Sequence, residues 1–71
     1  MPYVHIQVTD EGVTLDQKKQ LIAQTTEMLQ SVLNKNPKTT FVVIEEVSMD
    51  DWGVGGMTVH EFRQQSQSGT N

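Results

Sequence analysis

Phe-Val-Val-Ile at residues 41–44 is the stretch that decides the fold of this chain. These apolar residues, mostly β-branched, stand in a row without alternating, so they predict a strand that is covered on both faces. Such strands are typical of parallel sheets. The strand is expected within residues 39–47, and its apolar run ends where Glu45 and Glu46 begin.

A second strand is predicted over residues 3–8, where the side chains alternate loosely and β-branched and aromatic types are frequent. Its two faces would carry Val4, Ile6 and Val8 on one side and Tyr3, His5 and Gln7 on the other. We interpret His5 as a structural histidine rather than a ligand. The other histidine, His60, lies far along the chain, so no histidine pair has the spacing of a metal site.

A helix is predicted between the two strands. Thr14 and Gln17 fit a capping box, in which each side chain accepts a hydrogen bond from the backbone N–H of the other residue. The helix is expected to end near residue 33 or 34, ahead of an Asn-Pro dipeptide that disfavours helical geometry. From residue 21 onward the apolar spacing follows a period of 3.6 and predicts one buried stripe, with Lys18 and Lys19 on a solvated face.

A strand, a helix and a second strand make a βαβ unit, whose crossover is right-handed in nearly all proteins. The glycine-rich loop over residues 48–56 predicts a tight hairpin or bulge, and residues 57–59 a short strand. The predicted fold class is α+β (α/β-like), a βαβ unit with parallel strands plus a C-terminal β-hairpin. The domain is expected to span residues 1–63, with a polar, flexible tail over residues 64–71.

Size and composition predict self-association. A chain of 71 residues buries only a modest core, and without cysteine it has no disulfide to support that core. A lone βαβ unit also exposes two sheet edges and an apolar face. We therefore expect closed homo-oligomers (hexamers, trimers or dimers) to complete the fold.

Charge and hydropathy exclude several classes of partner. The net charge of -4 and the sequence pI of about 4.8 argue against a phosphate-binding surface, so no nucleic-acid partner is expected. No apolar run is long enough to span a membrane, and no signal-peptide pattern precedes the fold. The glycines of the loop lack the P-loop pattern and its lysine. A soluble, cytoplasmic protein is the expectation.

Pro2 follows the initiator methionine and is the strongest candidate for chemistry. Methionine before a small residue such as proline is readily removed, and the mature chain would then begin with a nucleophilic, titratable secondary amine. An α-amino group titrates near ~7.7–8.0, and burial or a nearby cation lowers that pKa. The alternative, which the dipeptide alone favours, is that the Met-Pro start affects only processing.

Trp52 is the only tryptophan and lies in the glycine-rich loop. It is either a core or interface anchor, or the apolar wall of a small pocket where desolvation would favour an uncharged amine. Asp50-Asp51 is interpreted as a solvated turn pair, with general acid–base work as the alternative. Of Glu45 and Glu46, one is expected to face solvent, while the other is a candidate for orienting a ligand.

These features resemble the 4-oxalocrotonate tautomerase family over nearly the whole chain, up to about Val59. The resemblance rests on Met-Pro opening a strand of the form Pro-Tyr-Val-x-Ile, Glu11-Gly12 before a helix with Asp-Gln-Lys at 16–18, Val-Val-Ile-Glu-Glu at 42–46, and Trp-Gly-Val-Gly-Gly at 52–56. It implies a βαβ monomer assembled into hexamers or smaller oligomers, and a proton shuttle without a cofactor. By this resemblance Pro2 is the general base and then the acid, and Trp52 is the aromatic wall that lowers its pKa.

The chain departs from the family pattern at two substrate-binding positions. The resemblance places arginines just after Glu-Gly and on the second strand, where this chain has Val13 and Phe41. Both changes remove a cation that would grip a substrate carboxylate and lower the Pro2 pKa. Removing an electrophilic donor typically costs ~10²–10³ in rate. Arg63, the only arginine, is the candidate replacement, reaching a neighbouring subunit's pocket from the C-terminal segment.

Three classes of function follow from these residues. The first is a keto–enol tautomerase acting on a small 2-keto or 2-hydroxydienoate-type acid that is less anionic than the family's usual substrate. The second is a hydratase, a dehalogenase or a carbonyl-condensing enzyme that uses the same amine. In the hydratase, Asp51, Glu45 or Glu46 would activate water. The third is a non-catalytic oligomeric binding module that has lost the substrate arginines.

Overall fold

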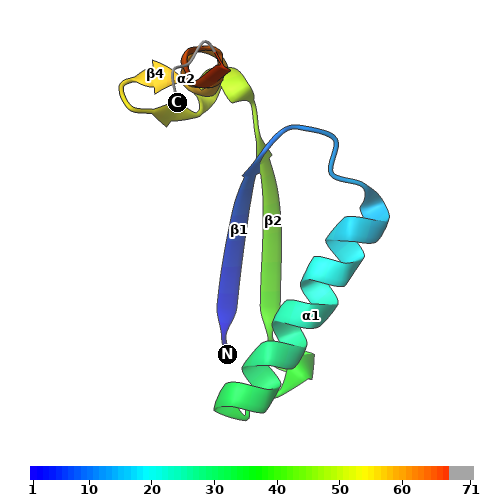
Figure 1. Ribbon diagram of the computed structural model, residues 1–71. Coiled ribbons are helices and arrows are strands. Elements are labelled where there is room, and N and C mark those ends of the chain that lie inside the picture. The colour runs from blue at the N-terminus through cyan, green and yellow to red at the C-terminus, as the bar shows by residue number, and fades with distance from the viewer. Residues whose placement is uncertain (68–71) are drawn as a thin grey trace.

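Two parallel strands, one long helix and a projecting C-terminal arm make up the part of the chain described by the computed structural model, residues 1–67 (Figure 1). The strands and main helices are β1 (Tyr3–Thr9), α1 (Leu15–Leu33), β2 (Phe41–Val47), β3 (Gly53–Val54), β4 (Met57–Thr58) and α2 (Val59–Gln67). The short 3₁₀ turns η1 (Pro37–Thr39) and η2 (Met49–Asp51) precede β2 and β3. Residues 48–67, which follow β2, are called the arm below.

β1 and β2 pair in parallel, from Tyr3 opposite Phe41 to Thr9 opposite Val47. α1 crosses over between them and lies along one side of the pair, while β3 and β4 form a separate antiparallel hairpin (Figure 1). The predicted βαβ unit and the predicted C-terminal hairpin are therefore confirmed. The short strand expected at residues 57–59 is β4, although Val59 already belongs to α2.

The ends of α1 follow from its sequence. The Thr14 hydroxyl accepts a hydrogen bond from the Gln17 N–H at 3.1 Å, and the Gln17 side chain accepts one from the Thr14 N–H at 2.9 Å, so the predicted capping box is present. Asn34 closes the helix in a left-handed conformation, with φ of 56°. The prediction of a solvated Lys18 is wrong, because its half-buried ammonium lies 2.6 Å from a carboxylate oxygen of Glu46 on β2.

α2 has no counterpart in the sequence-based prediction, which assigns residues 64–71 to a tail. Residues 64–67 instead continue α2, so the predicted boundary after residue 63 falls inside this helix, and residues 68–71 lie outside the described chain. The start of the helix has a local cause. The Glu61 carboxylate accepts a hydrogen bond from the Thr58 N–H at 3.3 Å, and the Thr58 hydroxyl accepts one from the Glu61 N–H at 3.4 Å. This second capping box is the reason that a polar segment becomes helical.

A single chain leaves its core incomplete. Among the described residues only Val59, at 7% exposure, is buried, and the predicted buried stripe of α1 contains no buried residue. The outer face of the sheet, away from α1, exposes Tyr3 (63%), Phe41 (52%) and Val43 (42%). The radius of gyration is 16.2 Å. A compact domain of this length would have about 11 Å. The apolar surface needs further cover, and other copies of the chain are its simplest source.

Candidate active site

Pro2 lies at the head of β1, at the N-terminal end of the sheet. Its carbonyl oxygen accepts a hydrogen bond from the Phe41 N–H at 3.0 Å, so its backbone is tied to the first residue of β2. Pro2 is half-buried, whereas Met1 is 85% exposed. Removal of Met1 would therefore leave a terminal amine at a place that the sheet fixes.

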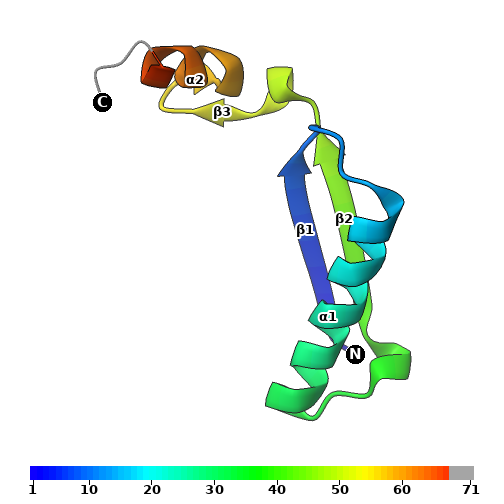
Figure 2. The ribbon, with the colours of Figure 1, turned by 45° about the vertical axis from the view of Figure 1, so that its right-hand side comes forward.

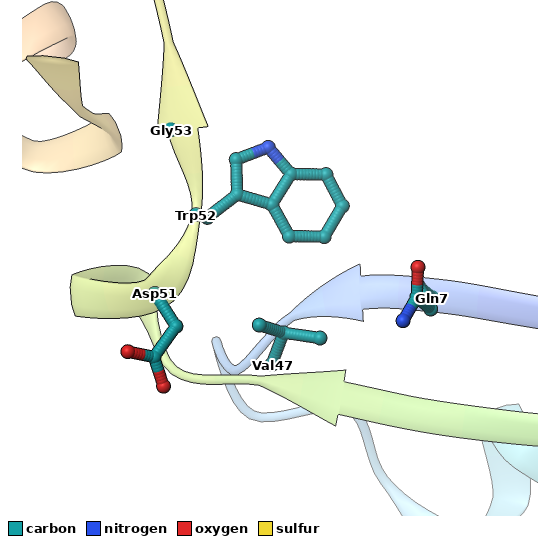
Figure 3. Close-up of a pocket in the computed structure, with 5 residues that line it drawn as sticks. All are labelled: Gln7, Val47, Asp51, Trp52 and Gly53. Atoms are coloured by element: carbon teal, nitrogen blue, oxygen red, sulfur yellow. The ribbon is translucent and has the colours of Figure 1, made fainter. Parts of the chain in front are cut away.

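Trp52 lies beyond the other end of the sheet, at the base of the arm (Figure 3). Its half-buried indole borders an open hollow of about 250 Å³ that Gln7, Val47, Asp51 and Gly53 also line. Figure 3 shows the indole on the same side as Val47 and the Gln7 amide, while the Asp51 carboxylate points away from the ring. The hollow combines an aromatic wall with an amide group at the strand ends.

The predicted site residues fall into two groups at opposite ends of the β1–β2 pair. Pro2 and Phe41 lie at the N-terminal end, whereas Trp52, Val13 and Arg63 belong to segments that follow the C-terminal ends of the strands. Strands of this length span about 20 Å, at roughly 3.3 Å per residue. A small molecule cannot touch Pro2 and Trp52 of the same chain. The pocket expected from the sequence is therefore not formed within one chain.

Val13 and Phe41, the two positions predicted to lack a cation, present apolar side chains at different places. Phe41 is 52% exposed on the outer face of the sheet and is paired with Tyr3, the residue after Pro2. Val13 is half-buried before α1, where it lines an open hollow of about 340 Å³ with residues of that helix. Each end of the sheet thus presents an apolar side chain at one of these two positions.

Arg63 projects from α2 and forms a two-point ion pair with Glu11, which lies between β1 and α1. Its two terminal nitrogens donate to the two carboxylate oxygens of Glu11, at 2.6 and 3.0 Å. The Thr9 hydroxyl donates to the same carboxylate. The hydrogen bonds from Arg63, and then the one from Thr9, lower the pKa of Glu11 from 4.5 to about 2. Glu11 in turn raises the pKa of Arg63, so both partners carry their charge at neutral pH.

A polar network occupies part of the outer face of the sheet. The Glu45 carboxylate accepts a hydrogen bond from the Gln7 amide at 2.9 Å and lies 2.9 Å from the His5 ring nitrogen Nε2. The Gln7 amide, and less strongly His5, lowers the pKa of Glu45. Glu46 points to the opposite face. The sequence prediction missed Gln7, which joins this network to the Trp52 hollow. Gln7 can be identified as a member of this network once the strand register is known, because it lies opposite Glu45.

The described chain has neither a metal-binding cluster nor a helix suited to a membrane. In residues 1–67, no three His, Cys, Asp or Glu side chains are grouped so that they would hold a metal ion. Over the same residues, no helix has the length and apolar character needed to cross a membrane.

Comparisons with known proteins show what the chain is similar to. Residues 2–61 match the family model described as tautomerase enzyme. The probable tautomerase K2 of Dickeya dadantii is 56% identical over 66 residues, which cover 93% of this chain and 98% of that protein. The crystal structure of DmpI from Helicobacter pylori is 39% identical, with a TM-score of 0.84 over 90% of this chain and 98% of that one. A heterohexamer 4-oxalocrotonate tautomerase from Chloroflexus aurantiacus has the same fold, with a TM-score of 0.79 at 24% identity over 89% of this chain and all of that one.

Proposed function

This chain belongs to the tautomerase family, and from that premise we propose that it is a cofactor-independent keto–enol tautomerase, an isomerase. The substrate is a small 2-keto or 2-hydroxydienoate-type acid. A proton leaves the enol oxygen and returns to a carbon of the same molecule, so atoms and electrons balance without a co-reactant. The observation that carries the proposal is the position of Pro2, which a hydrogen bond from β2 holds at the head of β1, directly after an exposed Met1.

The Pro2 amine acts first as a base and then as an acid. The neutral amine takes the enol hydroxyl proton, and the O–H electrons form the carbonyl. The electrons of the carbon–carbon double bond shift to the far carbon, which takes the proton back from the ammonium. An α-amino group titrates near ~7.7–8.0, and desolvation lowers that pKa, so a dry pocket keeps the amine neutral near neutral pH. Phe41, whose backbone N–H donates a hydrogen bond to the Pro2 carbonyl, supplies part of the apolar surroundings of the amine.

The complete site is formed between copies of the chain. Because about 20 Å of strand separates Pro2 from Trp52 within one chain, the Trp52 that lies against a given Pro2 comes from another copy. The exposed apolar side chains of the outer sheet face support such an assembly, as a hexamer, trimer or dimer. The hollow of about 250 Å³ beside Trp52 offers room for a small acid and for the amine of the neighbouring copy.

Arg63 is the cation that we assign to the substrate carboxylate. Glu11 occupies one donor on each terminal nitrogen of Arg63, and a guanidinium has five N–H donors in all. Donors therefore remain for a second carboxylate. Val13 and Phe41 contribute no charge, so the site is suited to one substrate carboxylate rather than two. An enol acid with a single negative charge is the better substrate.

Intact mass and a pair of enol substrates test this proposal. Intact mass shows whether Met1 is removed, because a retained methionine makes Pro2 an amide nitrogen without a basic lone pair. Ultraviolet absorbance then follows ketonisation of an arylpyruvate enol, with one carboxylate, and of a 2-hydroxydienedioate, with two. We expect Pro2→Ala to lower the rate by about 10²-fold or more and the enol with one carboxylate to be preferred. Pro37→Ala changes the other proline and is the matched control. Equal rates for wild type and Pro2→Ala would rule out the amine as the catalyst.

Asp51 supports a second candidate function, hydration of an unsaturated acid by the same amine. This residue lines the hollow that Trp52 borders, and a rotation of its side chain, whose carboxylate points away from the indole, would let it take a proton from water there. The Pro2 ammonium would protonate one carbon of the double bond, and the hydroxide left by the water would bond to the other. A product with a new hydroxyl group labelled from H₂¹⁸O, lost in Asp51→Asn and kept in Asp50→Asn, would identify a hydratase. Unlabelled keto product excludes it.

A further inference from the structure

The arm, which carries Trp52, is held together by contacts between its own segments. It projects from the C-terminal end of the sheet, with α2 lying away from α1 (Figure 2). Within it the Val59 N–H donates to the Trp52 carbonyl at 2.9 Å, and buried Val59 packs at the start of α2 next to β4. The chain enters the arm after Val47, whose carbonyl accepts a hydrogen bond from the Asp10 N–H at 2.8 Å. A rotation of the chain after Val47 would therefore move α2 and Trp52 together.

The Glu11–Arg63 ion pair joins the arm to the βαβ unit. Its two residues are 52 positions apart in the sequence, and each is held locally. On one side, Thr9 donates to Glu11, and Gly12 turns the chain with φ of 86°, a left-handed conformation that favours glycine. On the other side, an Arg63 terminal nitrogen lies 4.0 Å from the Met49 sulfur in η2. The pair thus links two segments of defined geometry.

We propose that Glu11 is a positioning residue, which through Arg63 sets the angle of the arm and hence the place of Trp52. A guanidinium–carboxylate pair with two parallel hydrogen bonds fixes orientation as well as distance, because both N–H donors must align with both oxygens. Arg63 lies on the second turn of α2, so its anchoring constrains the direction of that helix. The Glu11 pKa of about 2 keeps the carboxylate ionised at any pH at which an enol would be assayed.

The effect on turnover rests on the proposed function, in which Trp52 lies against the Pro2 of another copy. A misplacement of about 1 Å in a catalytic site can cost roughly 10²-fold in rate. The place of the arm is measurable without turnover as well. Trp52 is the only tryptophan, so the emission of the protein reports the surroundings of that residue alone.

The experiment compares Glu11→Gln, Arg63→Gln and the exchanged variant Glu11→Arg/Arg63→Glu in the full chain. The exchange keeps the ion pair and the summed length of its side chains, but it moves the guanidinium from α2 to the segment before α1. We expect each single variant to shift the Trp52 emission and to lower kcat/KM by about 10-fold to 100-fold. The exchanged variant should restore the emission, while its kcat/KM stays low because the guanidinium assigned to the substrate carboxylate has left position 63. Glu27→Gln, which changes an exposed carboxylate on α1, is the matched control and keeps wild-type values.

Two results would overturn the proposal. One is a Glu11→Gln protein with wild-type emission and wild-type kcat/KM. The other is an exchanged variant whose emission stays as shifted as that of Arg63→Gln, which would leave Arg63 with a role on the substrate alone. If wild type turns over no enol, the proposed function fails, while the emission and the hydrogen exchange of the Asp10 amide still decide whether the pair positions the arm. If circular dichroism shows that Glu11→Gln does not fold, Glu11→Asp, which withdraws the carboxylate by one methylene, takes its place.

Discussion

Mixing two inactive variants tests whether the site is formed between copies. Pro2→Ala removes the ring amine and keeps Trp52, while Trp52→Ala removes the aromatic wall and keeps Pro2. If a site takes Pro2 from one copy and Trp52 from another, mixed oligomers contain sites in which both groups are native. A site within one chain would never regain both.

The expected recovery follows from the geometry. About 20 Å of strand separates the two groups in one chain, so a native site needs a Trp52→Ala copy on the Pro2 side and a Pro2→Ala copy on the Trp52 side. In randomly mixed, equimolar oligomers each condition is met half of the time, so about a quarter of the sites are native. The mixture should therefore reach about 25% of wild-type specific activity, against almost none for either variant alone.

The assay refolds the two variants together from denaturant and follows ketonisation of the enol with one carboxylate. The same variants, refolded apart and combined just before the measurement, are the control. Native mass spectrometry shows whether the chains have mixed. A co-refolded sample that contains mixed oligomers, yet is no more active than the control, would refute the shared site.

Three further predictions concern charge and capping. Phe41→Arg places a guanidinium next to Pro2, and we expect kcat/KM for a dicarboxylate enol to rise by about 10²-fold. Its pH–rate profile should move to lower pH, because a cation lowers the Pro2 pKa. The folded pKa of Glu11 is about 2, below its ordinary value of 4.5. The contribution of ionised Glu11 to the stability of the folded chain is therefore complete above pH ~4.5 and is lost as the pH falls toward ~2. The Trp52 emission should follow that loss in wild type but not in Arg63→Gln. Thr14→Ala removes the N-cap of α1. It should lower the free energy of unfolding by about 0.5–2 kcal/mol, which urea denaturation measures.

The βαβ unit was predictable because its determinants are local. The alternation over residues 3–8, the capping box at Thr14 and the apolar run at residues 41–44 each specify one element. α2 is also locally determined, since Thr58 and Glu61 form its capping box. It was missed because residues 59–67 are otherwise polar and resemble a frayed end. The capping pattern outweighed the composition.

The candidate site was less predictable, because the order of motifs along a chain does not give the distance between them. Pro2 opens β1 and Trp52 follows β2, and in a parallel pair those places lie at opposite ends. The Glu11–Arg63 pair joins residues 52 positions apart, and no local pattern marks either as the partner of the other. Such pairs depend on the direction in which the arm leaves the sheet, which is a tertiary property.

In the proposed assembly, folding and chemistry depend on the same association. One chain buries only Val59 among its described residues, so a separated chain has little to hold its sheet and helix together. The Pro2 amine of such a chain lacks the Trp52 wall and should titrate near its ordinary ~7.7–8.0. Because assembly follows mass action, dilution should lower the specific activity, while the turnover that remains comes from assembled sites and keeps their kinetic pKa. Specific activity that stays constant on dilution to separated chains, or a kinetic pKa that rises as the chains separate, would show that a single chain turns over substrate and that its site is not shared.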